Sequence, residues 1–383
     1  MILEKALTSE TLKEEADTIA KAILRSDLVD DSTKSIIDSF PSGFKDLILE
    51  TVLKHIAENP DLREKFQKEL QRKKATNRWR MSINIDKQRG ADLADNLLHA
   101  YDTVGIHGQK EMPEDSLPKG LQRGGTEHLI FLALTCSIDY QRDAESLWAS
   151  SRRSFSDPEL RFLFDPEALS QTPLMDIIRG MGTYGLSKKP RRDAWIWKTV
   201  GTTFYKKWEG NPRNFLSDCG YEASNVLHRL KTDAHEQENT VVWDFPYLRG
   251  NKIGPMWLRM LRDNAGISAL KNFDKIPIPV DVHVARATLS TGIIRGQAVL
   301  STDELYAIVR NAWDSIYELR RSSNKLGVPL DIDEPLWHLS REGCSKRDVN
   351  TGICKVIDKC EVSDFCVAGM IKKGENGLWH IST

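Results

Sequence analysis

Apolar residues recur at helical spacing in several stretches of the chain. Between 303 and 321 an apolar side chain returns every three or four residues. Ser301 to Glu304, directly before this stretch, has the polar pattern of a helix start. A similar apolar face runs through 42–57 and ends at Asn59-Pro60. The pattern predicts an all-α chain.

Two other stretches indicate how the chain is divided. Residues 127–136 are almost entirely apolar, and periodicity alone allows either a buried helix or a strand there. Residues 105–125 are rich in glycine and proline, as expected of a linker. We therefore expect an N-terminal helical extension over 1–120, of unknown role, and a second region over 121–383.

A glycine turn followed by a helix is predicted at 248–262. Gly250 and Gly254 can adopt backbone angles that other residues avoid, and they let the main chain approach a ligand. Pro255 suits the first turn of a helix. Backbone N–H groups at such a helix start can bind an anion, which on DNA is a phosphate. Lys252 lies within the turn.

The segment 279–287 carries one acidic residue, Asp281, in an apolar run that continues through His283 to Arg286. A buried carboxylate is costly unless a partner stabilises its charge. Its place before a helical pattern also suits it to cap the free N–H groups of a helix. A carboxylate that caps a helix can still take part in a site.

Four of the six cysteines lie within 23 residues, at Cys344, Cys354, Cys360 and Cys366. In a protein expected to be cytoplasmic, such a group indicates metal binding rather than disulfides. Four thiolates suit either an iron–sulfur cluster or zinc. Unligated thiols remain the alternative.

Together the glycine turn, Val280-Asp281-Val282-His283 and the cysteine spacing resemble the helix-hairpin-helix (HhH-GPD) DNA glycosylases, in particular the endonuclease III-like proteins. The resemblance extends from about 126 to 366. It implies a two-lobed helical fold, a helix at 127–136 whose end fills the space of the extruded nucleotide, and a [4Fe–4S] cluster on the four cysteines, with zinc as the alternative. It also implies Asp281 as the catalytic carboxylate and Gly250, Lys252, Gly254 and Arg286 as DNA-binding residues.

The resemblance implies base excision from DNA, by cleavage of the N-glycosidic bond of a flipped base. Family members that also cut the strand use a lysine placed two residues after the hairpin glycine, and that position here is Met256. We therefore expect a monofunctional glycosylase. The alternatives are a glycosylase/lyase with a displaced lysine (Lys252, Lys271 or Lys275), a DNA-binding protein without catalysis, and a zinc-containing interaction module. The excised base is not specified.

Composition adds the remaining expectations. The net charge is −1, so any DNA-binding surface has to be a local basic patch. One such stretch, 72–80, has five basic residues and Trp79, and it suits either a solvated helix end or nucleic-acid contact. No apolar run approaches membrane-spanning length, and no signal peptide precedes the charged start. We expect a cytoplasmic, nucleoid-associated monomer with no membrane partner.

Overall fold

The structure is a computed structural model of the chain, and it describes residues 83–237, 240–348, 351–374 and 377–383. One compact unit contains Ser82–His235 and Val242–Thr383. The helix predicted over 42–57 and the basic stretch 72–80 lie outside the described residues. This compact unit is mostly helical, as the apolar periodicity predicts.

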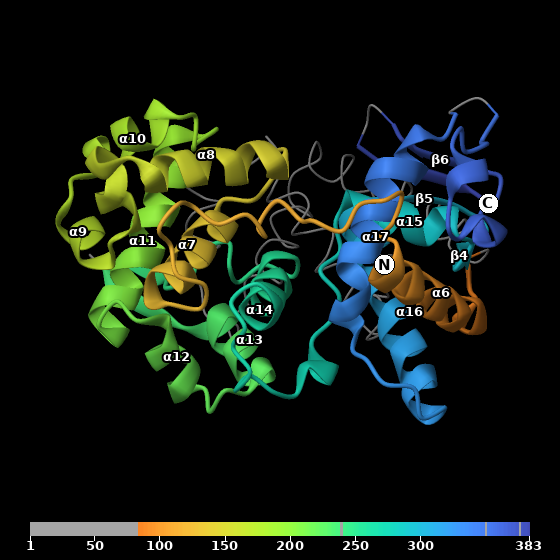
Figure 1. Ribbon diagram of the computed structural model, residues 1–383, viewed down its shortest axis with the longest axis horizontal. Helices are drawn as coiled ribbons and strands as arrows, with labels where there is room; N and C mark the ends of the chain where they lie inside the picture. Colours follow the sequence, from red (N-terminus) through yellow and green to blue (C-terminus); the bar gives the residue numbers. More distant parts are fainter. Residues whose placement is uncertain (1–82, 238–239, 349–350, 375–376) are drawn as a thin grey trace, which may run out of the picture. The chain divides into compact units, whose positions relative to one another are not determined.

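The first lobe is built around one hydrophobic core, and Figure 1 shows the helices from α7 to α14 gathered there. Its elements are α7 (Thr126–Ser137), α8 (Ala144–Ser156), η2 (Pro158–Phe164), α9 (Pro166–Gln171), α10 (Leu174–Thr183), α11 (Pro190–Trp208), α12 (Pro212–Asp218), α13 (Ala223–Thr232), α14 (Ile253–Asp263) and η3 (Phe273–Lys275). Strands β2 (Ala234–Gln237) and β3 (Thr240–Trp243) pair with one another between α13 and α14, and their Glu236–Val241 part belongs to the other unit. Helix α7 lies at its centre.

The second lobe has a separate hydrophobic core, formed by residues from both sides of the first lobe in the sequence. Its elements are β1 (Asn84–Ile85), α6 (Lys87–Thr103), α15 (Val282–Ser290), β4 (Ile294–Arg295), β5 (Gln297–Leu300), α16 (Thr302–Ser322), η4 (Pro329–Ile332), α17 (Asp333–His338), η5 (Leu339–Gly343), η6 (Cys344–Lys346), η7 (Ile357–Lys359), η8 (Ser363–Phe365), β6 (Met370–Lys373) and β7 (Trp379–Ser382). Strands β5, β7 and β6 form an antiparallel sheet, and β1 pairs with β4.

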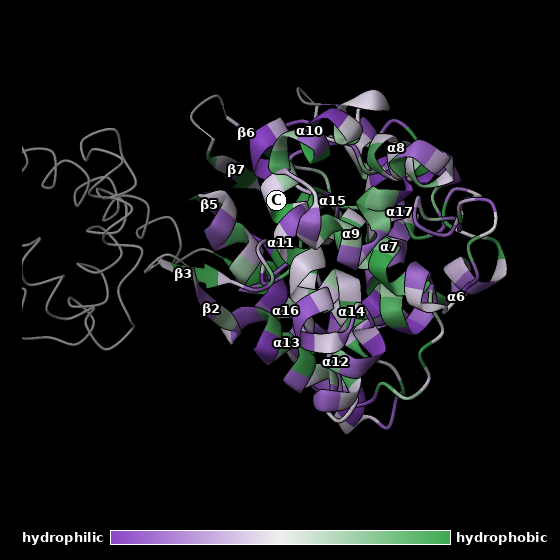
Figure 2. Cartoon of the chain, turned by 90° about the vertical axis from the view of Figure 1, so that its left-hand side faces the viewer, coloured by the Kyte–Doolittle hydropathy of each residue, from purple (hydrophilic) through white to green (hydrophobic). Residues whose placement is uncertain are grey.

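The main helix predictions are confirmed. Residues 127–136 form helix α7, whose residues are buried from His128 to Ser137, and Figure 2 shows α7 as strongly apolar. Helix α16 starts where predicted, because Ser301 accepts a hydrogen bond from Glu304 N while the Glu304 side chain accepts one from Ser301 N. Cys136 is a core residue, fully buried.

The glycine- and proline-rich stretch 105–125 connects α6 of the second lobe to α7 of the first (Figure 1). This stretch also contributes to the packing of the protein. Glu114 is buried there, and its carboxylate lies 2.6 Å from the Arg259 guanidinium of α14. Arg259 also pairs with Asp333 and Glu334 of α17. This buried ion cluster joins the linker and both lobes at one point.

Helix α6 falls within the sequence assigned above to the extension, yet it packs on α16 in the second core. Gly90 makes this packing close, since a Cβ there would lie 2.3 Å from Ile316 Cδ1. Strand β1 and helix α6, although they fall within the predicted extension, are therefore part of the second lobe. Among the helices that the structure describes, none has the length and apolar character to cross a membrane.

Candidate active site

A cleft of about 750 Å³ lies between the two cores. Its walls come from the loop after α7, the first turns of α14, the start of α15, and α17. Three aromatic residues, Tyr140, Trp148 and Trp337, are among those that line it. A cleft of this size suits a small-molecule-sized group such as one nucleotide.

Asp281 lies at the wall of this cleft and has two roles, one for each oxygen. Its Oδ1 accepts hydrogen bonds from His283 N (2.7 Å) and Val284 N (3.0 Å), so it caps α15 as the sequence predicts. Its Oδ2 faces Lys252 Nζ at 3.9 Å. The cap fixes the carboxylate, and the second oxygen stays available to the cleft.

Lys252 is the N-cap residue of α14, and its amine lies between two carboxylates. Nζ is 3.5 Å from Asp139 Oδ2 and 3.9 Å from Asp281 Oδ2. The side chain is 32% exposed, so the amine is partly shielded but reachable from the cleft. Partial burial lowers the pKa of Lys252, but Asp139, Asp281 and Asp333 outweigh this effect and raise the pKa well above its ordinary value.

Asp139 is a component of the site whose role the sequence does not reveal. The resemblance places residues 137–140 where a side chain fills the space of an extruded nucleotide. In the structure α7 ends at Ser137, and the nearly buried Asp139 carboxylate is directed at Lys252. Tyr140 and Gln141 follow it at the edge of the cleft, and Gln141 has a left-handed backbone (φ 51°).

Asp333 forms the inner part of the cleft together with Arg259. Its carboxylate is 2.9 Å from Arg259 Nε. Burial, with added repulsion from Asp281 and the neighbouring glutamates, raises the pKa of Asp333 to about 7, although Arg259 opposes this rise. The cleft therefore holds a carboxyl group that titrates near neutral pH.

The structure shows how the two glycines of the turn are used. Neither Gly250 nor Gly254 has a positive φ angle, so the turn does not use the backbone angles that only glycine adopts easily. Gly254 instead allows close packing, because a Cβ at this position would lie only 2.8 Å from both Leu227 Cδ1 and the Leu248 carbonyl oxygen. Its N–H donates to the Gly250 carbonyl (3.1 Å) and is not directed at a ligand. These glycines position Lys252.

The structure also shows where Lys271 and Lys275 lie, and where Met256 lies at the usual lysine position of the family. Met256 lines the cleft one helical turn after Lys252. Lys271 is 60% exposed and pairs with Glu222 (3.0 Å), and Lys275 is exposed. Neither of these two lysines lines the cleft, whereas Lys252 does. Arg286 lies one turn farther along α15 and lines a separate, adjacent cavity.

The four cysteines of 344–366 converge on one small cavity with largely apolar walls, including Leu339, Ile357 and Val362. All are thiols, with Cys344 and Cys354 buried. Burial raises the pKa of Cys344 and of Cys360, and the neighbouring thiols raise it further. Four thiolates at this site therefore require a cation to offset their repulsion.

The spacing of the sulfur atoms bears on which metal group they fit. Tetrahedral zinc, with Zn–S bonds of about 2.3 Å, brings its sulfurs within about 3.8 Å of one another. In the described part of the chain, no three of these sulfurs lie within 4.8 Å of one another. Arg347 donates to Cys366 Sγ (3.4 Å). As placed, the four thiols are not arranged as a single tetrahedral zinc ion holds its ligands, and four thiolates are also the ligands of an iron–sulfur cluster.

The local sequence does not show that Lys252 is placed to act as a nucleophile. Asp281 follows it by 29 positions in the sequence, and the local pattern gives no sign that the two side chains meet. Asp139 and Asp333 are farther away still in the sequence. Only the fold brings the lysine and the three carboxylates to one cleft.

Comparison with known families finds a match to part of the chain. Residues 261–368 match the model of the family described as AGOG: N-glycosylase/DNA lyase. No curated protein matches the chain. The matching part is less than a third of the chain, and it includes Asp281, Arg286 and all four cysteines. The match indicates that this part of the chain is a domain of the DNA glycosylase/lyase kind.

Proposed function

We propose that the protein is a bifunctional DNA glycosylase/lyase in which Lys252 is the nucleophile and Asp281 the stabilising carboxylate. The observation that carries this proposal is the 3.9 Å approach of Lys252 Nζ to Asp281 Oδ2 at the wall of the cleft. The match of 261–368 to an N-glycosylase/DNA lyase family supports it. It replaces the expectation of a monofunctional enzyme, which rested on Met256 at the usual lysine position.

The cleft suits a nucleotide that has left the DNA stack. Enzymes that act on a base extrude it into a pocket and hold it between aromatic or apolar side chains. Tyr140 and Trp337, which line the cleft and are partly exposed, supply such surfaces here. With the base among these rings, its sugar carbon C1′ comes to lie near the Lys252–Asp281 pair.

The chemistry follows from these two side chains. The Lys252 amine attacks C1′, and the N-glycosidic electron pair leaves with the base, which takes up a proton. Positive charge builds on the sugar during this step, and the Asp281 carboxylate stabilises it. Loss of the amine proton and opening of the sugar ring give an iminium between Lys252 and C1′. Loss of a C2′ proton then expels the 3′ phosphate and cuts the strand.

The amine has to be neutral to attack. Asp139 and Asp281 favour the ammonium form in the DNA-free protein, as the raised pKa of Lys252 indicates. We infer that the proton leaves through one of these carboxylates when the nucleotide enters and water is excluded. Asp139, nearly buried and 3.5 Å away, stabilises the ammonium form, so the acceptor that we propose is Asp281.

We further propose that Cys344, Cys354, Cys360 and Cys366 hold a [4Fe–4S] cluster. The convergence of four thiols on one cavity, with sulfurs not arranged as one tetrahedral zinc ion holds its ligands, supports this. The cluster supplies structural support to the 344–366 loop when bound. Arg347 assists, because its guanidinium donates to the Gly352 and Val367 carbonyls and so ties the two ends of the loop together.

The experiment uses duplex oligonucleotides that each carry one altered base. These include uracil, thymine mispairs, oxidised pyrimidines, adenine opposite a lesion and 8-oxoguanine. A strand nick without alkali is expected for at least one substrate, and Lys252→Gln should abolish it. Asp281→Asn should abolish base release while DNA binding persists. Base release that always needs alkali to reveal a nick would contradict the lyase assignment.

A further inference from the structure

The linker 105–125 begins with a tight turn that contacts the loop of the four cysteines, residues 344–366, called the cysteine loop below. His107, in this turn, has a left-handed backbone (φ 50°), which is uncommon for a residue other than glycine. Its backbone N–H donates to Glu361 Oε1 (2.8 Å), across 254 positions of sequence. Because Glu361 directly follows Cys360, this hydrogen bond joins the linker to the cysteine loop beside one of its thiols.

The imidazole of His107 lies against the wall of the cavity on which the four cysteines converge. A Cβ added to Gly343 would lie 2.5 Å from His107 Nε2, so the edge of the ring rests on the Gly343 backbone. Gly343 and Cys360 both line that cavity. A ring nitrogen of His107 also lies within 4.8 Å of Cys360 Sγ. The ring therefore approaches the cysteine cavity from outside the cysteine loop.

The Nε2 atom of His107 is buried, and within the part of the chain that the structure describes it has no hydrogen-bond partner. Buried polar atoms in folded proteins are normally hydrogen-bonded, because leaving one unpaired costs free energy. An imidazole nitrogen that carries a proton is a donor, so this atom calls for an acceptor that the described side chains do not supply. The sulfurs of an iron–sulfur cluster accept hydrogen bonds, and they suit this position.

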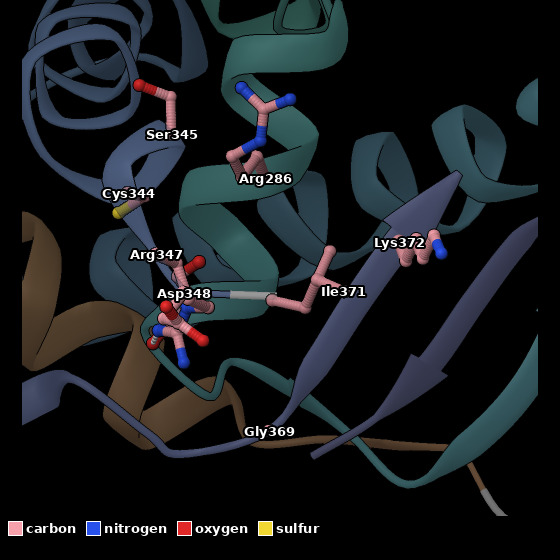
Figure 3. A pocket seen from close by; sticks show the side chains of 9 residues that line it. Arg286, Cys344, Ser345, Arg347, Asp348, Gly369, Ile371 and Lys372 are labelled. Atoms are coloured by element: carbon pink, nitrogen blue, oxygen red, sulfur yellow. Dashed lines mark hydrogen bonds between the residues drawn. The ribbon is translucent and has the colours of Figure 1, made fainter. Parts of the chain in front are cut away.

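The thiols of the cavity already attract N–H donors from the cysteine loop itself. Arg347 donates to Cys366 Sγ (3.4 Å), and Figure 3 shows Arg347 near Cys344 at the start of the loop. The Val362 backbone N–H approaches Cys360 and opposes the rise that burial causes in its pKa. Donors around the sulfurs are the surroundings that a negatively charged thiolate cluster needs. His107 adds one donor that comes from the linker.

A separate metal ion on His107, Cys360 and Glu361 is the competing interpretation, since their ligand atoms all lie within 4.8 Å of one another. The Glu361 carboxylate is exposed, and its Oε1 already accepts the His107 N–H. Cys360 belongs to the four converging thiols. A separate ion would have to take Cys360 from that group, so the arrangement favours a hydrogen bond over a second metal ion.

We propose that the Nε2–H group of His107 donates a hydrogen bond to a sulfur of the [4Fe–4S] cluster at Cys360, and so fastens the linker to the cluster. This inference rests on the proposed function, which places the cluster on the four cysteines. His107 lies outside the 261–368 segment that matches the glycosylase/lyase family. The linker of this chain therefore contributes a group to the cluster environment for which the family match gives no role.

The consequence of this hydrogen bond reaches the active-site cleft through the linker. Glu114 follows His107 by seven positions, lines the cleft and pairs with Arg259. Met112 and Pro113, directly before it, also line the cleft. The linker segment 107–114 thus runs from the cysteine loop to the cleft wall. When bound, the cluster stabilises this wall in addition to the cysteine loop.

The first experiment is pulsed EPR of the full chain, purified anaerobically, with and without ¹⁵N-labelled histidine. Radiolytic reduction of the frozen protein makes the cluster paramagnetic without a chemical reductant. The wild type should show a weak coupling to one histidine nitrogen, as expected of a hydrogen bond to sulfur. His107→Phe, which keeps an aromatic ring without the donor, should lose it. His107→Asn should lose it too, and asparagine tolerates the left-handed backbone of this position.

The second experiment measures the reduction potential of the cluster by voltammetry of the same proteins. Hydrogen bonds to the sulfurs are one of the factors that set this potential, and they favour the more negatively charged, reduced form. Both His107 variants should therefore have a lower potential. The reduced fraction at a fixed potential should change roughly ten-fold, which corresponds to about 59 mV for one electron. His228→Phe is the matched control, because His228 is exposed on α13 of the first lobe, and it should keep the wild-type potential.

A brown, iron-replete protein whose nitrogen coupling and potential are the same in the wild type and both His107 variants would overturn the hydrogen bond. A strong coupling, as from a histidine bound directly to iron, would also overturn it and assign ligation. A colourless wild type would refute the proposed cluster and this inference with it. The proposed glycosylase/lyase chemistry is tested separately, by strand nicking and base release, so its failure is distinguishable from the failure of the His107 contact.

Discussion

Replacement of Asp139 by asparagine should make Lys252 a better nucleophile near neutral pH. Asp139 Oδ2 lies 3.5 Å from Lys252 Nζ and stabilises the ammonium form. Asparagine keeps the shape of the side chain and removes its charge. The amine then loses its proton more easily, so the lyase rate should reach its plateau at a lower pH.

The size of the effect follows from the distance. Two unit charges 3.5 Å apart interact by about 1 kcal/mol in a water-like medium and by about 5 kcal/mol at an effective dielectric constant of 20. Asp139 is nearly buried while Lys252 is 32% exposed, so the true value lies between these limits. Each 1.36 kcal/mol moves a pKa by about one unit. The neutral-pH lyase rate should therefore rise by roughly five-fold or more.

The assay is single-turnover strand cleavage of a duplex with a preformed abasic site, which isolates the lysine step from base recognition. Rates are compared from pH 5 to pH 10 for the wild type, Asp139→Asn and Asp274→Asn. Asp274 is exposed and lies outside the cleft, so its variant should follow the wild-type profile. If Asp139→Asn gives the wild-type profile, Asp139 does not control the proton of the reacting amine.

Three further predictions concern the buried ion cluster and the cysteines. Arg259→Met leaves three carboxylates without their cation at the lobe junction and should lower the free energy of unfolding by about 3–5 kcal/mol, measured by urea titration. Burial raises the pKa of Asp333 to about 7 in the folded protein, so the folded state holds this proton more tightly than the unfolded state does. The resulting contribution to the free energy of unfolding is complete at pH values below the unfolded-state pKa, and it is lost as the pH rises to about 7. The fall in thermal midpoint between pH 5 and pH 7.5 should therefore be smaller in Asp333→Asn than in the wild type, and an equal fall would contradict the assigned pKa. The anaerobically purified protein should be brown with about four iron atoms per chain, and Cys354→Ser should lose the colour, whereas a colourless, zinc-loaded wild type would refute the cluster.

The fold and one half of the active site follow from local sequence. Helix α16 shows its apolar face and its Ser301–Glu304 start directly in the sequence, and Asp281 sits where a helix cap belongs. The apolar run that became α7 needed the family resemblance, because periodicity does not distinguish a short buried helix from a strand. The other half of the site depends on tertiary contacts. Nothing near Lys252 in the sequence distinguishes it from a surface lysine, and only the fold brings Asp139 to within 3.5 Å of its amine.

The most direct test of the account is to trap the covalent intermediate. Reduction of the iminium with sodium borohydride, during reaction with an abasic-site duplex, should join protein and DNA, and peptide mass spectrometry should locate the adduct on Lys252. Lys252→Gln should give no adduct, while Lys275→Gln, which alters an exposed lysine outside the cleft, should trap as the wild type does. An adduct on another lysine, or an undiminished adduct in Lys252→Gln, would contradict the assignment of the nucleophile.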